Sequence, residues 1–196
     1  MPYSSEHKRQ TRQKILEAAR GLFNAHGFSD VTIDMVMQAA GLTRGGFYNH
    51  FASKQALYAE AVASFLTGRG AQWRAAAGVH PEQPAPDIIQ RMLNSYLSAE
   101  HLADLDGQCP MIALPSDVAR EGPEVRGAYQ RLLEAMVGLF QRGGAEQAAV
   151  PRETAQALAA LCVGGMVLAR TLPDSDLAAQ VRSSALQAAL SLCPAE

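Results

Sequence analysis

The sequence has 196 residues, of which 48% are hydrophobic and 18% charged, and its formal net charge is −2. This profile excludes an intrinsically disordered chain, which would be poorer in apolar residues. The charge is unevenly distributed: residues 1–20 hold five basic and two acidic side chains, a net +3, and the remainder is net −5. A basic arm on an acidic body attracts phosphate at one end, with a solvated helix face as the plain alternative.

No feature of the sequence indicates export or a membrane segment. The first residues lack the apolar run of a signal peptide, and apolar stretches such as residues 158–169 are too short to span a bilayer. The three cysteines, Cys109, Cys162 and Cys193, are widely spaced and give no disulfide framework. We therefore expect a cytoplasmic protein that does not enter the membrane.

Alanine is abundant and apolar residues do not alternate, so the sequence predicts an all-α fold without a sheet. Thr32, Thr43 and Ser53 are placed as helix N-caps, and Gly27 and Gly41 as the residues that end helices. The nine predicted helices, with their caps, span residues 5–26, 32–41, 43–51, 53–77, 87–101, 111–120, 124–142, 151–171 and 174–192.

Residues 32–54 have the pattern of a helix-turn-helix: a helix, a glycine turn and a second, very short helix. The second helix contains Gly45 and Gly46, each costing about 0.5–1 kcal/mol relative to Ala. Phe47 and Phe51, at i and i+4, must therefore anchor it to the core. An exposed glycine pair is useful where a DNA backbone comes close; the plain alternative is a loop.

A longer run of residues resembles the DNA-binding domain of the tetracycline-repressor (TetR/AcrR) family over roughly residues 8–60. The matching positions are Lys14-Ile15-Leu16, Leu22-Phe23, Gly27-Phe28, Thr32, Ala40-Gly41, Phe47-Tyr48, His50-Phe51, Lys54 and Leu57-Tyr58. The resemblance implies a three-helix DNA-binding domain with a helix-turn-helix, joined to a helical ligand-binding and dimerisation domain. It divides the chain into residues 1–52 for DNA binding and residues 53–196 for effector binding and dimerisation.

The resemblance also implies which side chains contact double-stranded DNA. Helix N-termini and hydroxyls favour phosphate, and Arg44 occupies a base-reading position, since a guanidinium can address O6 and N7 of guanine together. For His50 the alternative is a cation that interacts with the helix dipole. The expected DNA-binding residues are Thr32, Thr43, Arg44, Gly45, Gly46, Tyr48, Asn49, His50 and Lys54.

Asp34 departs from the family pattern, because an acid cannot approach phosphate favourably. It could orient Arg44, accept a hydrogen bond from a cytosine amine, or only interact with the dipole of its own helix. The sequence leaves these three roles open.

In the C-terminal part, the resemblance implies a homodimer through the last two helices and a pocket for an unknown small effector. The large side chains available to line this pocket are Trp73, Met92, Tyr96, Met111, Tyr129, Met136 and Phe140, with core packing as the alternative for each. Cys109 precedes a predicted helix start, where a thiol becomes more reactive, so it is a candidate redox sensor; the alternative is a buried apolar side chain.

Other functions are less well supported by the residues. The cluster His101, Asp104, Asp106 and Cys109 could bind a metal, but the irregular spacing argues against it, and we expect neither metal nor cofactor. Enzyme motifs are missing and a Cys109–His101 dyad has no orienting third group, and a helical interaction protein leaves the glycine pair unexplained. The prediction is a ligand- or redox-responsive transcriptional repressor that binds a palindromic operator as a dimer. A small effector, or modification of Cys109, would release it.

Overall fold

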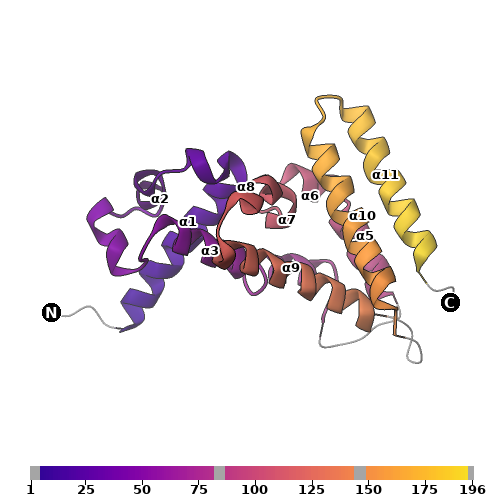
Figure 1. The fold of residues 1–196 in the computed structure, drawn as a ribbon, viewed down its shortest axis with the longest axis horizontal. Helices are drawn as coiled ribbons and strands as arrows, with labels where there is room; N and C mark the ends of the chain where they lie inside the picture. Colours follow the sequence, from indigo (N-terminus) through magenta and orange to yellow (C-terminus); the bar gives the residue numbers. More distant parts are fainter. Residues whose placement is uncertain (1–4, 82–86, 144–148, 194–196) are drawn as a thin grey trace. The chain divides into compact units, whose positions relative to one another are not determined.

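The computed structural model describes residues 5–81, 87–143 and 149–193, and these ranges are helical and contain no strand (Figure 1). The predicted all-α fold is confirmed, and the described ranges hold eleven α-helices and one 3₁₀ helix in place of the nine predicted helices. In chain order the elements are α1 (Ser5–Asp30), α2 (Ile33–Ala39), η1 (Arg44–Asn49), α3 (Lys54–Ser64), α4 (Arg69–Ala76), α5 (Ile88–Tyr96), α6 (Ala99–Ala103), α7 (Pro110–Ala113), α8 (Pro115–Arg120), α9 (Pro123–Arg142), α10 (Arg152–Thr171) and α11 (Ser175–Leu192).

The higher count arises because three predicted helices are each divided. The prediction of one long helix over residues 53–77 is wrong, since α3 ends at Ser64 and α4 begins after Gly68. Arg74 donates to the Leu66 carbonyl at 2.7 Å, which satisfies a backbone group left open by this break. The Ser98 hydroxyl caps α6 and so ends the preceding helix.

The contacts of the chain divide it into two compact units. Unit 1 comprises Met1–Phe65 and Leu105–Gln130, and unit 2 comprises Leu66–Asp104 and Arg131–Glu196. The helix α9 begins in unit 1 and ends in unit 2. These packing units do not test the predicted division by function, in which residues 1–52 bind DNA and residues 53–196 bind the effector and dimerise. That division stays a prediction.

Unit 1 is built around α1, which contacts α2, α3, α7 and α8. Its apolar stripe is buried, with Ile15 and Ala19 fully enclosed. The rings of Phe23, Phe28 and Tyr58 form a cluster with centroids 4.6–5.9 Å apart. Phe23 and Phe28 belong to α1, before the predicted helix-turn-helix, and Tyr58 belongs to α3, after it. The cluster therefore packs the segments on both sides of this motif into one core.

The end of α1 has a break at Gly27, as the sequence indicates. Gly27 has φ +79° and ψ 171°, a conformation that side-chain-bearing residues rarely adopt. The Phe28 amide donates to Asp117 Oδ2 at 2.9 Å, and a Cβ at position 27 would lie only 2.8 Å from that oxygen. Glycine is therefore required both for its backbone angle and for the close approach of α8.

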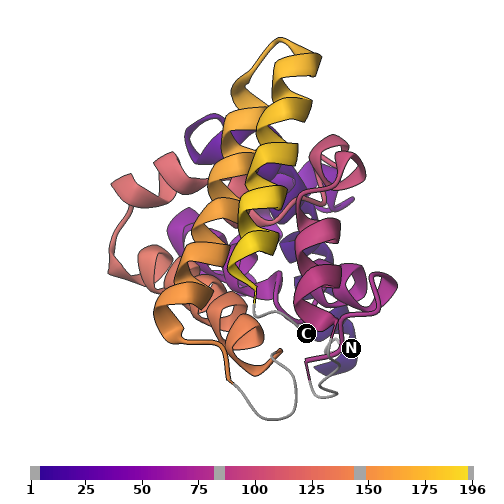
Figure 2. The same cartoon turned by 90° about the vertical axis from the view of Figure 1, so that its right-hand side faces the viewer.

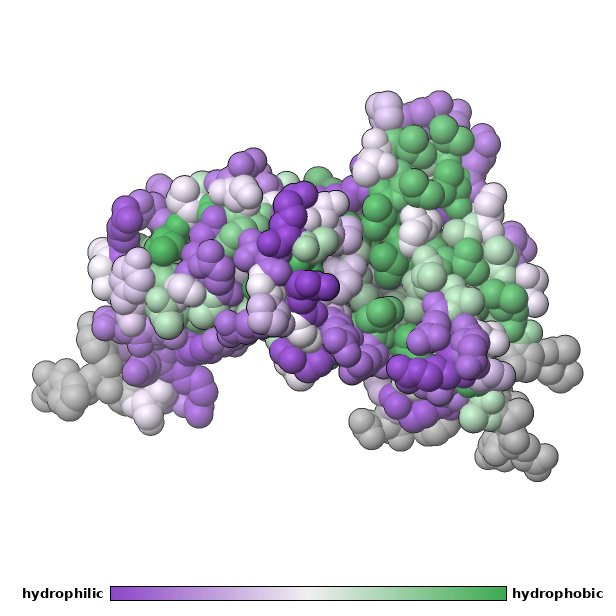
Figure 3. Space-filling model, viewed as in Figure 1, coloured by the Kyte–Doolittle hydropathy of each residue, from purple (hydrophilic) through white to green (hydrophobic). Residues whose placement is uncertain are grey.

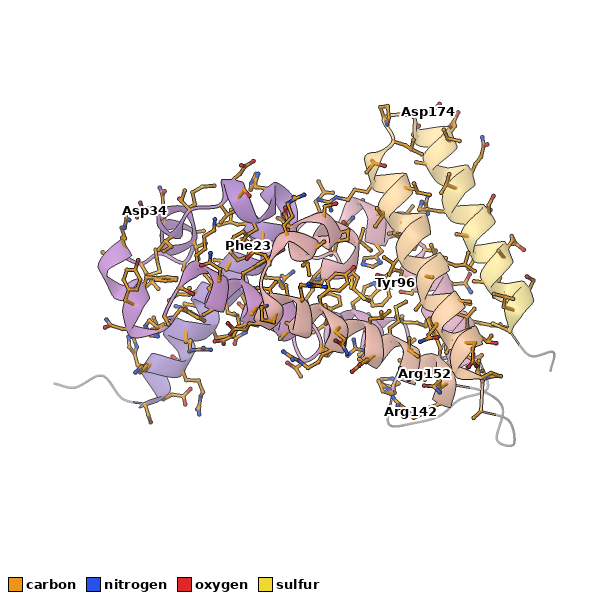
Figure 4. All side chains as sticks on the ribbon, in the orientation of Figure 1. Phe23, Asp34, Tyr96, Arg142, Arg152 and Asp174 are labelled. Atoms are coloured by element: carbon orange, nitrogen blue, oxygen red, sulfur yellow. The ribbon has the colours of Figure 1, made fainter. Side chains whose placement is uncertain are left out.

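Unit 2 contains the helical hairpin of α10 and α11, which lie side by side in both views (Figures 1 and 2). Asp174 lies in the connecting turn and caps α11, its Oδ1 accepting from the Asp176 amide at 2.8 Å (Figure 4). The two helices approach closely at Gly165, because this residue has no side chain. A Cβ added there would lie only 2.7 Å from the Ala185 Cβ.

The outer side of this hairpin is apolar. Figure 3 shows hydrophobic surface over α10 and α11, and Leu168, Leu177 and Leu192 are 56%, 44% and 44% exposed. Within the described ranges α10 is long and apolar enough to cross a bilayer by length and composition alone. Its residues Leu158 and Cys162 are fully buried within the unit.

Candidate nucleic-acid interface

The helix-turn-helix begins with a well-capped α2. The Thr32 hydroxyl accepts a hydrogen bond from the Met35 amide at 3.2 Å, as its placement as an N-cap predicts. At the other end Gly41 has φ +70°, and Leu42 N donates to Met37 O at 2.8 Å. This is the Schellman arrangement, in which a left-handed glycine lets the last carbonyls find partners.

The second helix of the motif, η1, is a 3₁₀ helix and not an α-helix. Thr43 has the extended backbone of an N-cap, but its side chain makes no capping hydrogen bond. Instead the Gly46 amide donates to the Thr43 carbonyl at 3.1 Å, a three-residue step. A short segment with two glycines gains little from its own backbone, so packing decides its form.

Two phenylalanines provide that packing. Phe47 and Phe51 are 0% and 3% exposed, and their ring centroids are 5.8 Å apart. Neighbouring Tyr48 points outward and is 65% exposed. The anchoring role predicted for the two phenylalanines is confirmed, and the opposite face of η1 is available to solvent.

The sequence-predicted DNA-binding residues gather on this exposed part of unit 1. A Cβ added at Gly45 would meet nothing within 4 Å, whereas at Gly46 the nearest atom is Met37 Cε at 3.6 Å. The exposed members of the set are Thr32, Thr43, Arg44, Gly45, Tyr48 and Asn49, and the half-buried ones are Gly46, His50 and Lys54.

His50 ends η1, and its Nδ1 is buried without a hydrogen-bond partner among the described residues. Burial, and then the positive charges of Lys8 and Arg12, lower the pKa of His50 below its ordinary value of 6.5. The imidazole is therefore mostly neutral at neutral pH, which weakens the alternative that it serves as a helix-terminal cation.

Lys54 is the first residue of α3, and its ammonium lies 4.2 Å from the centre of the Phe28 ring. Burial lowers the pKa of Lys54, against the raising effect of Glu121 and Asp30. The contact with Phe28 restrains the amine near the end of α1.

Two charged residues of this surface have partners that sequence reasoning either left open or missed. Arg44 Nη1 donates to Asp34 Oδ2 at 2.7 Å, so one of the three roles considered for Asp34 is visible in the structure. Arg12 lies 4.4 Å from the Phe51 ring centre and pairs with Glu60 at 2.5 Å. The basic N-terminal arm is a signal for Arg12, but its partner is 48 positions away and has no local signature.

The residues predicted to line an effector pocket fall into the two units. Trp73 and Tyr96 are in edge-to-face contact with centroids 6.0 Å apart, and the rings of Trp73 and His101 are tilted by 33° with centroids 4.8 Å apart. In unit 1 the Tyr129 hydroxyl donates to the Met111 carbonyl at 3.2 Å. Met92, Met136 and Phe140 are buried in unit 2. The pocket itself stays a prediction.

Cys109 is the N-cap residue of α7 and is 1% exposed. Burial, with a smaller effect from Cys109, raises the pKa of Tyr129 to about 12. In the part of the chain that the structure describes, no three His, Cys, Asp or Glu side chains lie together as metal ligands, so His101, Asp104, Asp106 and Cys109 do not assemble a site there.

A capped helix, a left-handed glycine turn and a short anchored second helix with a polar outer face define a helix-turn-helix, a motif used by one class of DNA-binding proteins. Comparison with known proteins shows which family this motif resembles. Residues 15–61 match the sequence model of the bacterial regulatory proteins of the tetR family. Over these residues the chain is similar to the TetR family of helix-turn-helix transcriptional regulators, and both a curated regulator and solved structures of TetR-family regulators resemble it.

The curated relatives match mainly through this domain. The transcriptional regulator SrpR of Pseudomonas putida is 49% identical over 45 residues, 23% of this chain and 21% of the relative. The transcriptional repressor DhaR of Mycobacterium sp. strain GP1 is 28% identical over 153 residues, 76% of this chain and 74% of the relative. For the first three relatives the match spans only 21–34% of their own length.

Solved structures match over nearly the whole chain. The reduced form of Escherichia coli NemR has a TM-score of 0.73 and 18% identity, covering 95% of this chain and 100% of that one. A TetR-family regulator from Cytophaga hutchinsonii has a TM-score of 0.74 and 19% identity, covering 99% and 100%. These likenesses establish the fold of the C-terminal helices, for which the sequence match is weak.

Proposed function

We propose that the protein is a dimeric, effector-responsive transcriptional repressor that binds a palindromic operator through η1. The observation that carries this proposal is the two-sided character of that helix. Phe47 is fully enclosed, while Arg44, Gly45 and Tyr48 are exposed, and a Cβ added at Gly45 would meet nothing within 4 Å. A helix with two glycines is a poor structural element, and it is well suited to a surface that a DNA backbone approaches.

The dimer is proposed to form through the apolar outer side of α10 and α11. Its exposed leucines, Leu168 on α10 with Leu177 and Leu192 on α11, belong to the apolar surface over these helices (Figure 3), and a contiguous apolar patch is typical of a protein–protein interface. A symmetric pair would place two reading helices about 34–36 Å apart, matching half-sites of one helical turn. The repressor assignment follows relatives such as DhaR, which is a transcriptional repressor.

In this proposal residues 1–52 read DNA, and residues 53–196 bind the effector and dimerise. Thr32, Thr43, Tyr48, His50 and Lys54 contact phosphates, and Arg44 reads a base while Gly45, Gly46 and Asn49 lie against the groove. The site of action is the cytoplasm, where the operator lies.

The test is a salt titration of duplex binding by the full chain. The logarithm of the binding constant should fall linearly with the logarithm of salt concentration, with a slope of about −0.9 for each phosphate neutralised. Arg44→Ala should relax base preference, whereas Lys54→Ala should weaken all duplexes similarly and flatten the slope by about 1. A chain that binds no duplex at low ionic strength would refute the proposal.

Two routes of release are considered, a small effector and modification of Cys109. A thiol that is 1% exposed is accessible to a reagent only after local opening, so we favour the effector. Cys109→Ser separates the routes. If oxidant or electrophile releases the wild-type chain from DNA but not the variant, Cys109 is the sensor, and an unchanged response removes it from the mechanism.

A further inference from the structure

The ion pair between Asp34 and Arg44 joins the first turn of α2 to the first residue of η1. Its two atoms, Asp34 Oδ2 and Arg44 Nη1, are 2.7 Å apart, and the side chains are 56% and 67% exposed. Figure 4 shows Asp34 on the outer side of unit 1. The pair thus lies on the surface that the proposed function assigns to DNA.

Helix capping does not account for this acid. The N-cap of α2 is Thr32, whose hydroxyl already accepts from the Met35 amide. Asp34 directs its carboxylate across the turn to Arg44 instead. Exposed ion pairs contribute little to stability because water screens them, so stability alone does not explain a negative charge on a phosphate-facing surface.

Recognition of a base explains it better. Arg44 carries five N–H donors in a rigid fork, and Asp34 accepts from Nη1. This contact restrains the guanidinium while other N–H groups stay available beside Gly45, where the surface is open. An arginine restrained in this way pays less entropy when it binds O6 and N7 of guanine.

The Asp34 carboxylate also disfavours a nonspecific contact between Arg44 and a phosphate. An unrestrained Arg44 would pair with any nearby phosphate, which gives affinity without sequence information. With Asp34 beside it, the arginine is partly neutralised and the carboxylate itself repels phosphate. The pair therefore lowers affinity for every duplex that does not offer guanine at the right place.

We propose that Asp34 is a specificity-determining residue of the DNA-reading surface, which acts by positioning Arg44 for guanine. This inference rests on the proposed function, and it names the side chain on which operator choice depends. Asp34 is a positioning residue, so its effect should vanish when Arg44 is absent.

The experiment is a double-mutant cycle with full-length wild type, Asp34→Asn, Arg44→Ala and the double variant. The probes are a duplex selected by wild type from a random-sequence pool and a scrambled duplex of equal composition. The measured quantity is the ratio of the two affinities. Asp34→Asn should lower this ratio about 5- to 150-fold, the range for one bidentate base contact, and should change it less than about twofold in the Arg44→Ala background.

Asp87→Asn is the matched control, because Asp87 pairs with Arg91 at 2.6 Å on an exposed part of unit 2. It should leave the ratio unchanged. Melting temperatures verify folding, and Asp34→Ser provides a second variant that also removes the charge. The inference is overturned if Asp34→Asn leaves the affinity ratio unchanged. It is also overturned if Asp34→Asn lowers the ratio as much in the Arg44→Ala background as in the wild type. Failure of wild type to select any duplex would instead overturn the proposed function.

Discussion

Replacing Phe47 with Ala should destabilise the protein strongly, although the residue belongs to a short, glycine-rich segment. The side chain is 0% exposed and packs against Phe51 and Tyr48. Phe-to-Ala substitutions at buried positions cost about 3–5 kcal/mol. In a chain of this size 1 kcal/mol corresponds to about 2–4 °C, so we expect the melting temperature to fall by roughly 6–20 °C.

Tyr48→Phe is the matched control, because it changes the adjacent aromatic residue, which is 65% exposed. It keeps the edge-to-face contact with Phe47, at 5.2 Å between centroids, and removes only the hydroxyl. Stability should change by less than about 0.5 kcal/mol, whereas duplex affinity should fall about 2- to 10-fold through loss of one phosphate hydrogen bond.

The assays are thermal unfolding followed by far-ultraviolet circular dichroism and fluorescence anisotropy with a labelled duplex. The reasoning is refuted if Phe47→Ala costs less than about 1 kcal/mol, because the helix would then not depend on its buried ring. A large loss of stability in Tyr48→Phe would contradict the division of η1 into an anchored and an exposed side.

Three further predictions concern glycines and a buried histidine. Gly165→Ala should lower the melting temperature, because the added Cβ would overlap the neighbouring helix. Gly164→Ala has nothing within 4 Å of the added Cβ and should raise the free energy of unfolding by about 0.5–1 kcal/mol. Equal shifts of melting temperature in the two variants would contradict this packing. Gly27→Ala should destabilise by about 1 kcal/mol or more, through its positive φ and the nearby Asp117 carboxylate; chemical denaturation measures this loss. Burial lowers the pKa of His101 in the folded state below its ordinary value of 6.5, so the folded protein favours the neutral imidazole. The resulting contribution to the free energy of unfolding is complete above pH 6.5 and is lost as the pH falls through the folded-state pKa. Melting curves against pH should therefore show a smaller acid loss in His101→Phe, and identical profiles would argue against a neutral buried imidazole.

Short-range features of the fold could be read from the sequence because their causes are local. Thr32 and Ser53 cap helices through their own hydroxyls, at 3.2 and 3.0 Å from backbone amides, and Gly27 and Gly41 adopt the positive φ expected of helix-ending glycines. Phe47 and Phe51 had to be buried because nothing else could hold so short a helix. These arguments need only residue type and spacing.

Other features required contacts between distant residues. The helix predicted over residues 53–77 breaks at Gly68, with Arg74 satisfying a carbonyl at the break. Gly68 and Gly70 are a weak local signal for such a break, because isolated glycines are also tolerated within helices. Likewise the sequence did not predict which of its three possible partners Asp34 contacts, and the structure shows its carboxylate beside Arg44, ten positions away.

The sequence by itself determined the helical class, the position of the helix-turn-helix and the residues proposed to contact DNA, since capping, glycine conformation and helical periodicity act within a few residues. Tertiary structure decided the 3₁₀ form of η1, the division of the chain into two packing units and the partners of Asp34, Arg12 and Asp117. These depend on packing and on charge pairs between segments far apart in the chain, whose free energies no local pattern encodes.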